Sequence, residues 1–367
     1  MNRNTALRAA LEHSVSHGLT FAAFRLPGEP PELWAQRDPD LETVDGALMW
    51  ELNEVFVVAP FLIDAERVPF IRADVELAFG EFDPDIALLE SCAGAARAAV
   101  AHVPPTTREA FMANVEQART TIGSGALRKV ALSRVMRVDA RAQDAVGLFL
   151  DALSARPDSF VAMINTPVHG LWIGASPERL VHEEEDLVHV DALAATMPAA
   201  KAHADAAAWG AKERDEQQQV TDAVLHAFTE LGLSDVRVTG PQVTTVNEVA
   251  HLHSRLQADL LGRPLSDLVL ALHPTPAVGG WPKDPAIAFI KAHETHNRGL
   301  YTGFWGPWNP DGRTDLFVNI RCMRLLDDHA LLFVGAGITA GSDAGAEWNE
   351  TEEKAQAWTR PIAALRT

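Results

Sequence analysis

The chain of 367 residues has little cysteine, few basic residues and no long apolar run. Its two cysteines, Cys92 and Cys322, lie far apart without metal-type spacing, which argues against a disulfide framework and a thiolate zinc site. No run approaches the ~18 apolar residues that a membrane span needs, and the first apolar stretch includes Glu12 and two histidines. We therefore expect an unexported protein of the reducing cytoplasm.

Basic residues are outnumbered: 31 lysines and arginines stand against 50 aspartates and glutamates, a formal net charge of -19. Such a charge repels phosphate backbones and anionic membranes, so neither nucleic acid nor a membrane is an expected partner. An anionic ligand would have to meet local cations or a metal ion.

The residues that are present describe a globular protein. An apolar content of 47% and a charged content of 22% are typical of chains that bury a sizeable core. The length allows two domains or one large unit, and the lack of repeats and low-complexity segments favours one compact body. Residues 1–105 carry only weak patterns because prolines interrupt them. These prolines are Pro27, Pro30, Pro31, Pro69, Pro104 and Pro105.

The periodicity is clearer from Thr107 onward. Apolar residues recur there at helical spacing until Gly123, which predicts a helix that ends at the glycine. Further helices are expected at about 210–231 and from about 344 to near Pro361. Strands are expected at 127–138, 159–165, 170–175, 187–193, 315–324 and 330–338. Consecutive strands with separate helices favour an α+β fold over strict alternation of strands and helices.

A lysine occupies an unusual place in the strand expected at 127–138. Lys129 shares one face with Ala131 and Ser133, whereas larger apolar residues occupy the other face. If this face points inward, loss of solvent would make the neutral, basic form of the lysine more accessible. The alternative is a surface lysine on an edge strand.

Two pairs of glutamates lie on two expected helices. The apolar stripe of the 210–231 helix leads backward onto Glu213 and Glu216, and the C-terminal helix carries Glu347, Glu350 and Lys354 on one face. The pairs could meet around one hard cation, and ligation by oxygen alone favours Mg²⁺ over zinc. Alternatively, the acids simply favour the dipole of helix turns that project beyond the core.

Two segments rich in glycine or proline adjoin these elements. Segment 334–342, Val-Gly-Ala-Gly-Ile-Thr-Ala-Gly-Ser, follows an expected strand, so its amides could approach a carboxylate, or it could be a tight turn. Segment 273–282 is a turn-rich loop before a helix expected to start near Pro282.

Seven segments, taken in order, resemble the signature of the chorismate-utilising enzymes, and the isochorismate synthases among them match best. The segments are Lys129–Arg134, Ile173–Leu180, Lys212–Glu216, His273–Gly280, Ile320–Cys322, Gly335–Ile338 and Glu347–Glu350. The resemblance implies an α+β fold: a single large domain of antiparallel sheets that enclose a core, with helices outside. It also implies that 1–105 is a weakly matching N-terminal part of this fold and that 106–367 is the chorismate-binding catalytic region.

The resemblance implies hydration of chorismate at C2 with loss of the C4 hydroxyl, giving isochorismate for menaquinone or siderophore biosynthesis. Such a reaction needs a base and an acid. By resemblance, Lys129 is the base that activates water and Glu178 is the acid that protonates the departing hydroxyl. Burial would raise the pKa of Glu178 and keep its proton available.

The resemblance also assigns a metal site and a substrate site. Glu216 and Glu350 would bind Mg²⁺ directly, while Glu213 and Glu347 would hold its waters. The residues implied to bind or line the substrate are His251, Thr275, Ala277, Arg321, Gly335, Gly337 and Lys354.

Three features depart from the pattern usual among the relatives. Ala195 stands where they carry glycine, Gln217 stands where many carry histidine, and segment 197–209 is rich in alanine and short. If the missing glycine lets backbone approach the substrate, the methyl group of Ala195 costs space or demands another local shape.

Other functions remain open at this stage. Relatives that aminate chorismate usually need a glutaminase and lack a lysine at the position of Lys129, so we expect water as the nucleophile and no glutaminase partner. Because relatives are often monomers, the resemblance also implies a monomer. Salicylate synthases share Lys129 and the metal site and then eliminate pyruvate, so they are the main alternative. A non-catalytic chorismate-binding protein is a further alternative.

Overall fold

The computed structural model describes residues 3–80, 84–99, 102–233, 235–246 and 249–366. Two nine-stranded sheets form its centre, and every described strand pairing is antiparallel. The first sheet has the order β14 (Gly280–Trp281), β7 (Lys129–Val138), β18 (Ala330–Ile338), β17 (Cys322–Leu325), β9 (Gly170–Ser176), β8 (Phe160–Thr166), β1 (Phe21–Arg25), β2 (Glu32–Ala35) and β6 (Val75–Ala78). The second has the order β12 (Arg237–Val246), β13 (Val249–Asp259), β11 (Leu187–Pro198), β10 (Arg179–Glu184), β16 (Arg313–Val318), β15 (Phe304–Trp308), β4 (Val55–Ala59), β5 (Arg67–Arg72) and β3 (Glu42–Asp45).

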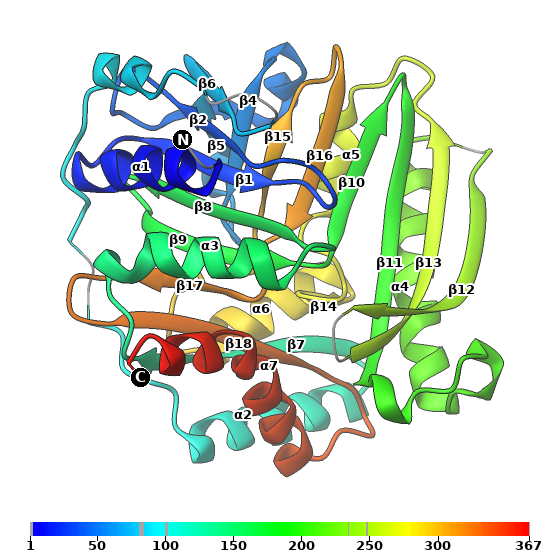
Figure 1. The fold of residues 1–367 in the computed structure, drawn as a ribbon. Helices are drawn as coiled ribbons and strands as arrows, with labels where there is room; N and C mark the ends of the chain where they lie inside the picture. Colours follow the sequence, from blue (N-terminus) through cyan, green and yellow to red (C-terminus); the bar gives the residue numbers. More distant parts are fainter. Residues whose placement is uncertain (1–2, 81–83, 100–101, 234, 247–248, 367) are drawn as a thin grey trace.

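Helices cover the outer faces of both sheets (Figure 1). On the first sheet lie α1 (Arg3–Ser16), α3 (Ala145–Ala155) and α7 (Ala344–Ala364), and on the second lie α4 (Ala211–Glu230) and α5 (Leu265–Leu272). Helices α2 (Arg108–Gly123) and α6 (Lys283–His293) pack against β7. Short 3-10 helices span Gly46–Glu51, Asp64–Glu66, Ile86–Ser91, Ala142–Asp144, Ala199–Lys201 and Ala206–Ala208.

An aromatic core holds the two sheets together. Phe24 and Phe160 of the first sheet pack with Phe56 and Phe317 of the second, and the rings of Phe160 and Phe317 stack with centroids 4.2 Å apart. Burial of such rings is the main favourable term that joins two sheets. The expected α+β domain of antiparallel sheets around a core with helices outside is therefore confirmed.

Most expected elements from Thr107 onward are present. Thr107 caps α2 by accepting a hydrogen bond from the amide of Ala110 at 3.2 Å, and the helix ends at Gly123. The strand expected at 187–193 continues to Pro198 as β11.

The single strand expected at 315–324 is wrong, because β16 and β17 belong to different sheets. Arg321, with a φ of 52°, lies in left-handed backbone between them and lets the chain cross from one sheet to the other.

The helix end expected near Pro361 is also wrong, because α7 continues to Ala364. Proline removes the amide that would bind the carbonyl of Ala357, and the Arg156 guanidinium donates to that carbonyl instead. Among the described residues, no helix is both long enough and apolar enough to cross a bilayer.

Candidate active site

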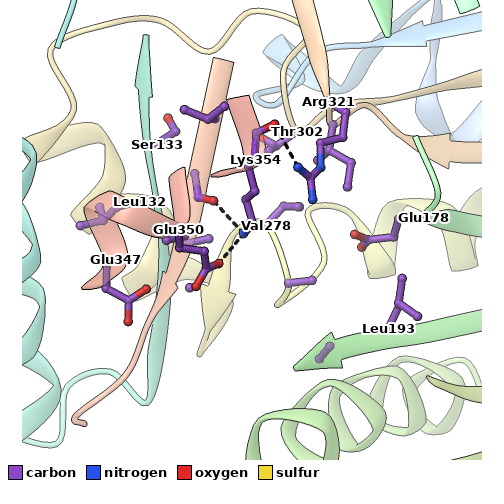
Figure 2. Close-up of a pocket in the computed structure, with 18 of the residues that line it drawn as sticks. Leu132, Ser133, Glu178, Leu193, Val278, Thr302, Arg321, Glu347, Glu350 and Lys354 are labelled. Atoms are coloured by element: carbon purple, nitrogen blue, oxygen red, sulfur yellow. Dashed lines mark hydrogen bonds and ion pairs between the residues drawn. The ribbon is translucent and has the colours of Figure 1, made fainter. Parts of the chain in front are cut away.

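One cavity of about 180 Å³ collects the predicted site residues (Figure 2). Its walls come from β7 and β18 of the first sheet, from β11 and β13 of the second, and from α4 and α7. The segments that carry Glu178, Val278, Thr302 and Arg321 complete them. Every predicted site residue except Thr275 lines it. Thr275 is buried, and its hydroxyl interacts with the Glu178 carboxyl.

Lys129 begins β7, and its side chain is only 2% exposed. Its Nζ donates to Oε1 of Glu216 at 2.7 Å, across from the first sheet to α4. Gly337 of β18 leaves room for this lysine, because a Cβ there would lie 2.9 Å from the Lys129 Cε. The inward-facing lysine expected from the strand pattern is thus present, and its partner is one of the predicted metal ligands.

Glu178 lies in the turn between β9 and β10 and faces the cavity (Figure 2). Burial raises its pKa to about 7, and the positive charges of Lys129 and Lys354 offset only part of that effect. A carboxyl group with this pKa holds its proton over much of the range near neutrality and can deliver it to a leaving group.

The four predicted metal-site glutamates come from the first two turns of two helices. Glu213 and Glu216 project from α4, Glu347 and Glu350 project from α7, and all four line the same cavity. Acids therefore occupy the positions of α4 that continue its apolar stripe toward the N-terminus, because there the helix borders the cavity and not the core.

The donor chemistry of these glutamates fits Mg²⁺, since four carboxylates from two helices surround one space. Two of them are held by cations: Glu216 by Lys129, and Glu350 by Lys354 at 2.6 Å. Within the described part of the chain, no three His, Cys, Asp or Glu side chains are already arranged around a common ion. The ligand types fit, and the carboxylates would have to turn from their lysines to hold the ion.

Two cations form the part of the cavity suited to carboxylates (Figure 2). Lys354 Nζ donates to the Gly335 carbonyl at 2.9 Å, and Arg321 Nη1 donates to the Lys354 carbonyl at 3.1 Å. Among the described residues, this is the only hydrogen bond of the Arg321 guanidinium, so most of its donors remain for a ligand. Burial lowers the pKa of Arg321, and the charges of Tyr301 and Glu350 oppose that effect.

His251 of β13 lines the cavity beside these cations. Burial, and then the positive charges of Arg321 and Lys354, lower its pKa to about 4. The ring is therefore neutral at neutral pH, so it can accept or donate a hydrogen bond but adds no charge for a dianion.

Several residues lining the cavity were missed by the sequence analysis. They are Ser133, Leu193, Val278, Arg298, Tyr301 and Thr302. Ser133 could have been found, because it shares the Lys129 face of β7. Segment 294–302 carries no periodicity, and its place at the cavity is set by the tertiary fold.

Two of the three departures noted in the sequence, Ala195 and Gln217, are accommodated locally. Ala195 lies in a β-bulge with a φ of 54°, and its methyl group packs in a small apolar cluster with Trp209 and Leu252. The Gln217 amide donates to the Ala192 carbonyl at 2.8 Å and to Ser254 Oγ at 3.1 Å, so it ties α4 to the second sheet.

Comparison with known proteins identifies a family for the chain. The family described as "Chorismate binding enzyme" matches residues 85–363. The chain is 32% identical over 263 residues to anthranilate synthase component 1 of Streptomyces coelicolor, covering 68% of this chain and 51% of that protein. It is 33% identical over 205 residues to the salicylate biosynthesis isochorismate synthase of Pseudomonas aeruginosa, covering 53% of this chain and 42% of that protein. The chain thus spans about half the length of these curated relatives.

The fold has a solved counterpart. The structure of MenF, the menaquinone-specific isochorismate synthase from Escherichia coli, matches with a TM-score of 0.76 at 19% sequence identity, over 95% of this chain and 90% of that chain. Because the family match covers most of the chain and its motif residues meet at one cavity, the chain belongs to the family of chorismate-binding enzymes.

Proposed function

We propose that the protein is a Mg²⁺-dependent isochorismate synthase. The observation that carries this proposal is that Glu178, with a pKa of about 7, shares one cavity with Lys129, four glutamates and the cations Arg321 and Lys354. This set supplies an acid, a candidate base, oxygen ligands for a hard cation and donors for carboxylates.

In the proposed reaction a water oxygen bonds to C2 of chorismate, the C1=C2 and C5=C6 double bonds shift to C1=C6 and C4=C5, and the C4–O bond breaks. Lys129 Nζ takes a proton from the water, and Glu178 gives one to the departing hydroxyl, so the net change is an isomerisation. Lys129 Nζ donates to Glu216 Oε1 at 2.7 Å, so in the proposed reaction Glu216 turns to another partner before Lys129 meets the water.

The ring carboxylate of the substrate is proposed to lie near the glutamates of α4 and α7. A bound Mg²⁺ would neutralise this carboxylate and orient it, with Glu216 and Glu350 as direct ligands and Glu213 and Glu347 on its waters. Arg321 and Lys354 would hold the other carboxylate, and the backbone of Gly335 and Gly337 would border the ring.

We further propose a cytoplasmic monomer that works without a glutaminase. The free thiols Cys92 and Cys322 are compatible with a reducing compartment. The product could serve menaquinone or siderophore synthesis, because both uses start from the same reaction.

The test is the product formed from chorismate and Mg²⁺ at neutral pH, separated by chromatography, with and without EDTA. Isochorismate in equilibrium with chorismate supports the proposal, and Lys129→Ala should then abolish turnover while the variant still binds chorismate. Salicylate and pyruvate would assign the chain to the alternative lyase reaction, and no metal-dependent product would favour a binding protein.

A further inference from the structure

The cavity contains two buried arginines whose hydrogen bonds differ. Arg321 leaves most of its guanidinium donors available, whereas Arg298, only 3% exposed, uses all five. Its Nε and Nη2 donate to the two carboxylate oxygens of Glu294 at 2.8 and 2.6 Å. Its remaining donors bind the carbonyls of Val278 and Ala131 at 2.9 and 2.7 Å and the Thr302 hydroxyl at 3.1 Å.

A guanidinium whose five N–H groups are all taken has no donor for a substrate carboxylate. The Phe61 ring closes one face of the group, with the guanidinium carbon 4.3 Å from the ring centroid. Arg298 therefore borders the cavity without being equipped to bind an anion there.

The groups that Arg298 holds belong to three walls of the cavity. Ala131 lies on β7 two residues after Lys129, Val278 lies in the 273–282 loop, and Thr302 precedes β15. Glu294 adds a further tie to β7, because its Oε1 accepts the Ser133 amide hydrogen at 2.7 Å. The Ser133 hydroxyl in turn lies 2.9 Å from His296 Nε2.

From these contacts we propose that the buried Arg298–Glu294 pair is a positioning device. It fixes the position of β7, which carries Lys129 and Ser133, relative to the 273–282 loop, which contributes Val278 to the cavity wall. Both side chains are 2% exposed, so water does not replace these bonds when one partner is lost. The inference rests on the proposed function for its kinetic consequence, but the contacts are independent of it.

The reaction rate depends strongly on the positions of the reacting groups, since displacing one of them by about 1 Å can lower the rate 10²-fold. Arg298→Lys keeps the charge but cannot reach Glu294, Ala131 and Val278 together, because an ammonium is a compact donor on a flexible stem. We expect kcat to fall roughly 10- to 100-fold, with KM changed less than about threefold because no donor to the substrate is lost.

The matched control is Arg25→Lys. Arg25 is likewise buried and donates to three carbonyls, those of Leu153, Arg156 and Ser159, but it lies outside the cavity. This variant should lose thermal stability and keep kcat. An equal loss of kcat in both lysine variants would overturn the proposal, because it would show a general effect of loosening the fold.

Arg298→Met alone leaves Glu294 as an unpaired buried charge and could fail to fold, so the informative variant is Arg298→Met combined with Glu294→Gln. Removing both charges should restore the melting temperature relative to Arg298→Met, because no buried charge is then left unpaired. The kcat of the double variant should stay as low as that of Arg298→Lys. If kcat recovers together with the melting temperature, the pair has only a structural role and the proposal is overturned.

Hydrogen exchange separates this inference from the proposed function. Peptides that cover 129–135 and 275–280 should exchange faster in Arg298→Lys than in the wild type, while peptides of β4 and β5 should not change. Unchanged exchange at 129–135 overturns the inference even if chorismate is converted. Faster exchange there supports the tie even if the wild type proves inactive on chorismate, in which case the proposed function alone fails.

Discussion

At the scale of single residues, Glu178 shows how burial prepares a side chain for acid chemistry. Its pKa of about 7 arises mainly from desolvation, although two lysines oppose the shift. The folded protein holds a proton on this carboxyl in a pH range where the unfolded chain does not. Folding and the proposed catalysis therefore both demand the protonated carboxyl.

Glu178→Gln tests both demands. We expect kcat to fall about 10²- to 10⁴-fold, because the proposed general acid is lost. The wild-type pKa in the folded state, about 7, exceeds the ordinary value of 4.5, so the stability contributed by the proton is complete below about pH 4.5 and is lost as the pH rises through 7. Urea unfolding should show the variant gaining about 3 kcal/mol on the wild type between pH 4.5 and pH 8. A difference between the two proteins that does not change with pH would contradict this assignment.

Ala195 carries two opposing effects at one position. Its left-handed backbone costs an alanine about 1 kcal/mol, while its buried methyl group contributes about 0.8 kcal/mol. We therefore expect Ala195→Gly to change the free energy of unfolding by less than about 1 kcal/mol. Ala192→Gly, at a fully buried position of the same strand without a positive φ, should cost about 2 kcal/mol. Equal losses in the two variants would show that the backbone of Ala195 carries no strain.

At the scale of elements, two helix starts determine where the acids gather. Asp343 caps α7 by accepting a hydrogen bond from the Ala346 amide at 2.9 Å, and Glu347 follows in the first turn. Glu213 occupies the first turn of α4, which begins after Gly210. Each glutamate pair thus extends from a helix N-terminus, where backbone amides and the helix dipole stabilise negative charge near the cavity.

Glu350→Gln tests the metal assignment on α7. A carboxamide is a weaker ligand than a carboxylate for a hard cation, so we expect the Mg²⁺ affinity, measured by titration calorimetry, to fall about 10-fold or more. Glu353→Gln is the control, because Glu353 is exposed on the same helix outside the cavity and should leave the affinity unchanged. Equal affinities in both variants would remove Glu350 from the ligand set.

At the scale of the whole molecule, the first hundred residues are structurally inseparable from the rest. Strands β1, β2 and β6 extend the first sheet beyond β8, and β4, β5 and β3 extend the second beyond β15. Phe24 and Phe56 place this segment in the core between the sheets. The boundary near 105 therefore marks a change in sequence resemblance. The assignment of 106–367 as the chorismate-binding catalytic region stays a prediction.

Removal of residues 1–105 should prevent folding, because it exposes the edges of β8 and β15 together with aromatic core surface. We expect the 106–367 fragment to aggregate or to lack a cooperative thermal transition by near-ultraviolet circular dichroism. The full chain measured under the same conditions is the reference. A fragment that unfolds cooperatively and binds chorismate would show that the N-terminal strands are dispensable.

Local patterns predicted many elements of the chain from Thr107 onward. The α2 helix, the inward face of β7 and the two glutamate pairs each depend on periodicity within a few turns or residues, which the sequence displays directly. The break within 315–324 was not predictable in this way. The apolar alternation continues through the segment that passes from one sheet to the other. The residue type of Arg321 does not indicate its left-handed backbone either.

The sequence by itself indicated many of the elements after Thr107, the acidic balance and a family resemblance carried by seven ordered segments. Only the tertiary structure decided that Lys129 pairs with Glu216, that Glu178 is buried deeply enough to hold a proton near pH 7, and that Arg298 ties three walls together. The physical reason is that these properties depend on contacts between residues far apart in the chain and on the exclusion of water from the space they enclose. Neither quantity is encoded in the spacing of neighbouring residues.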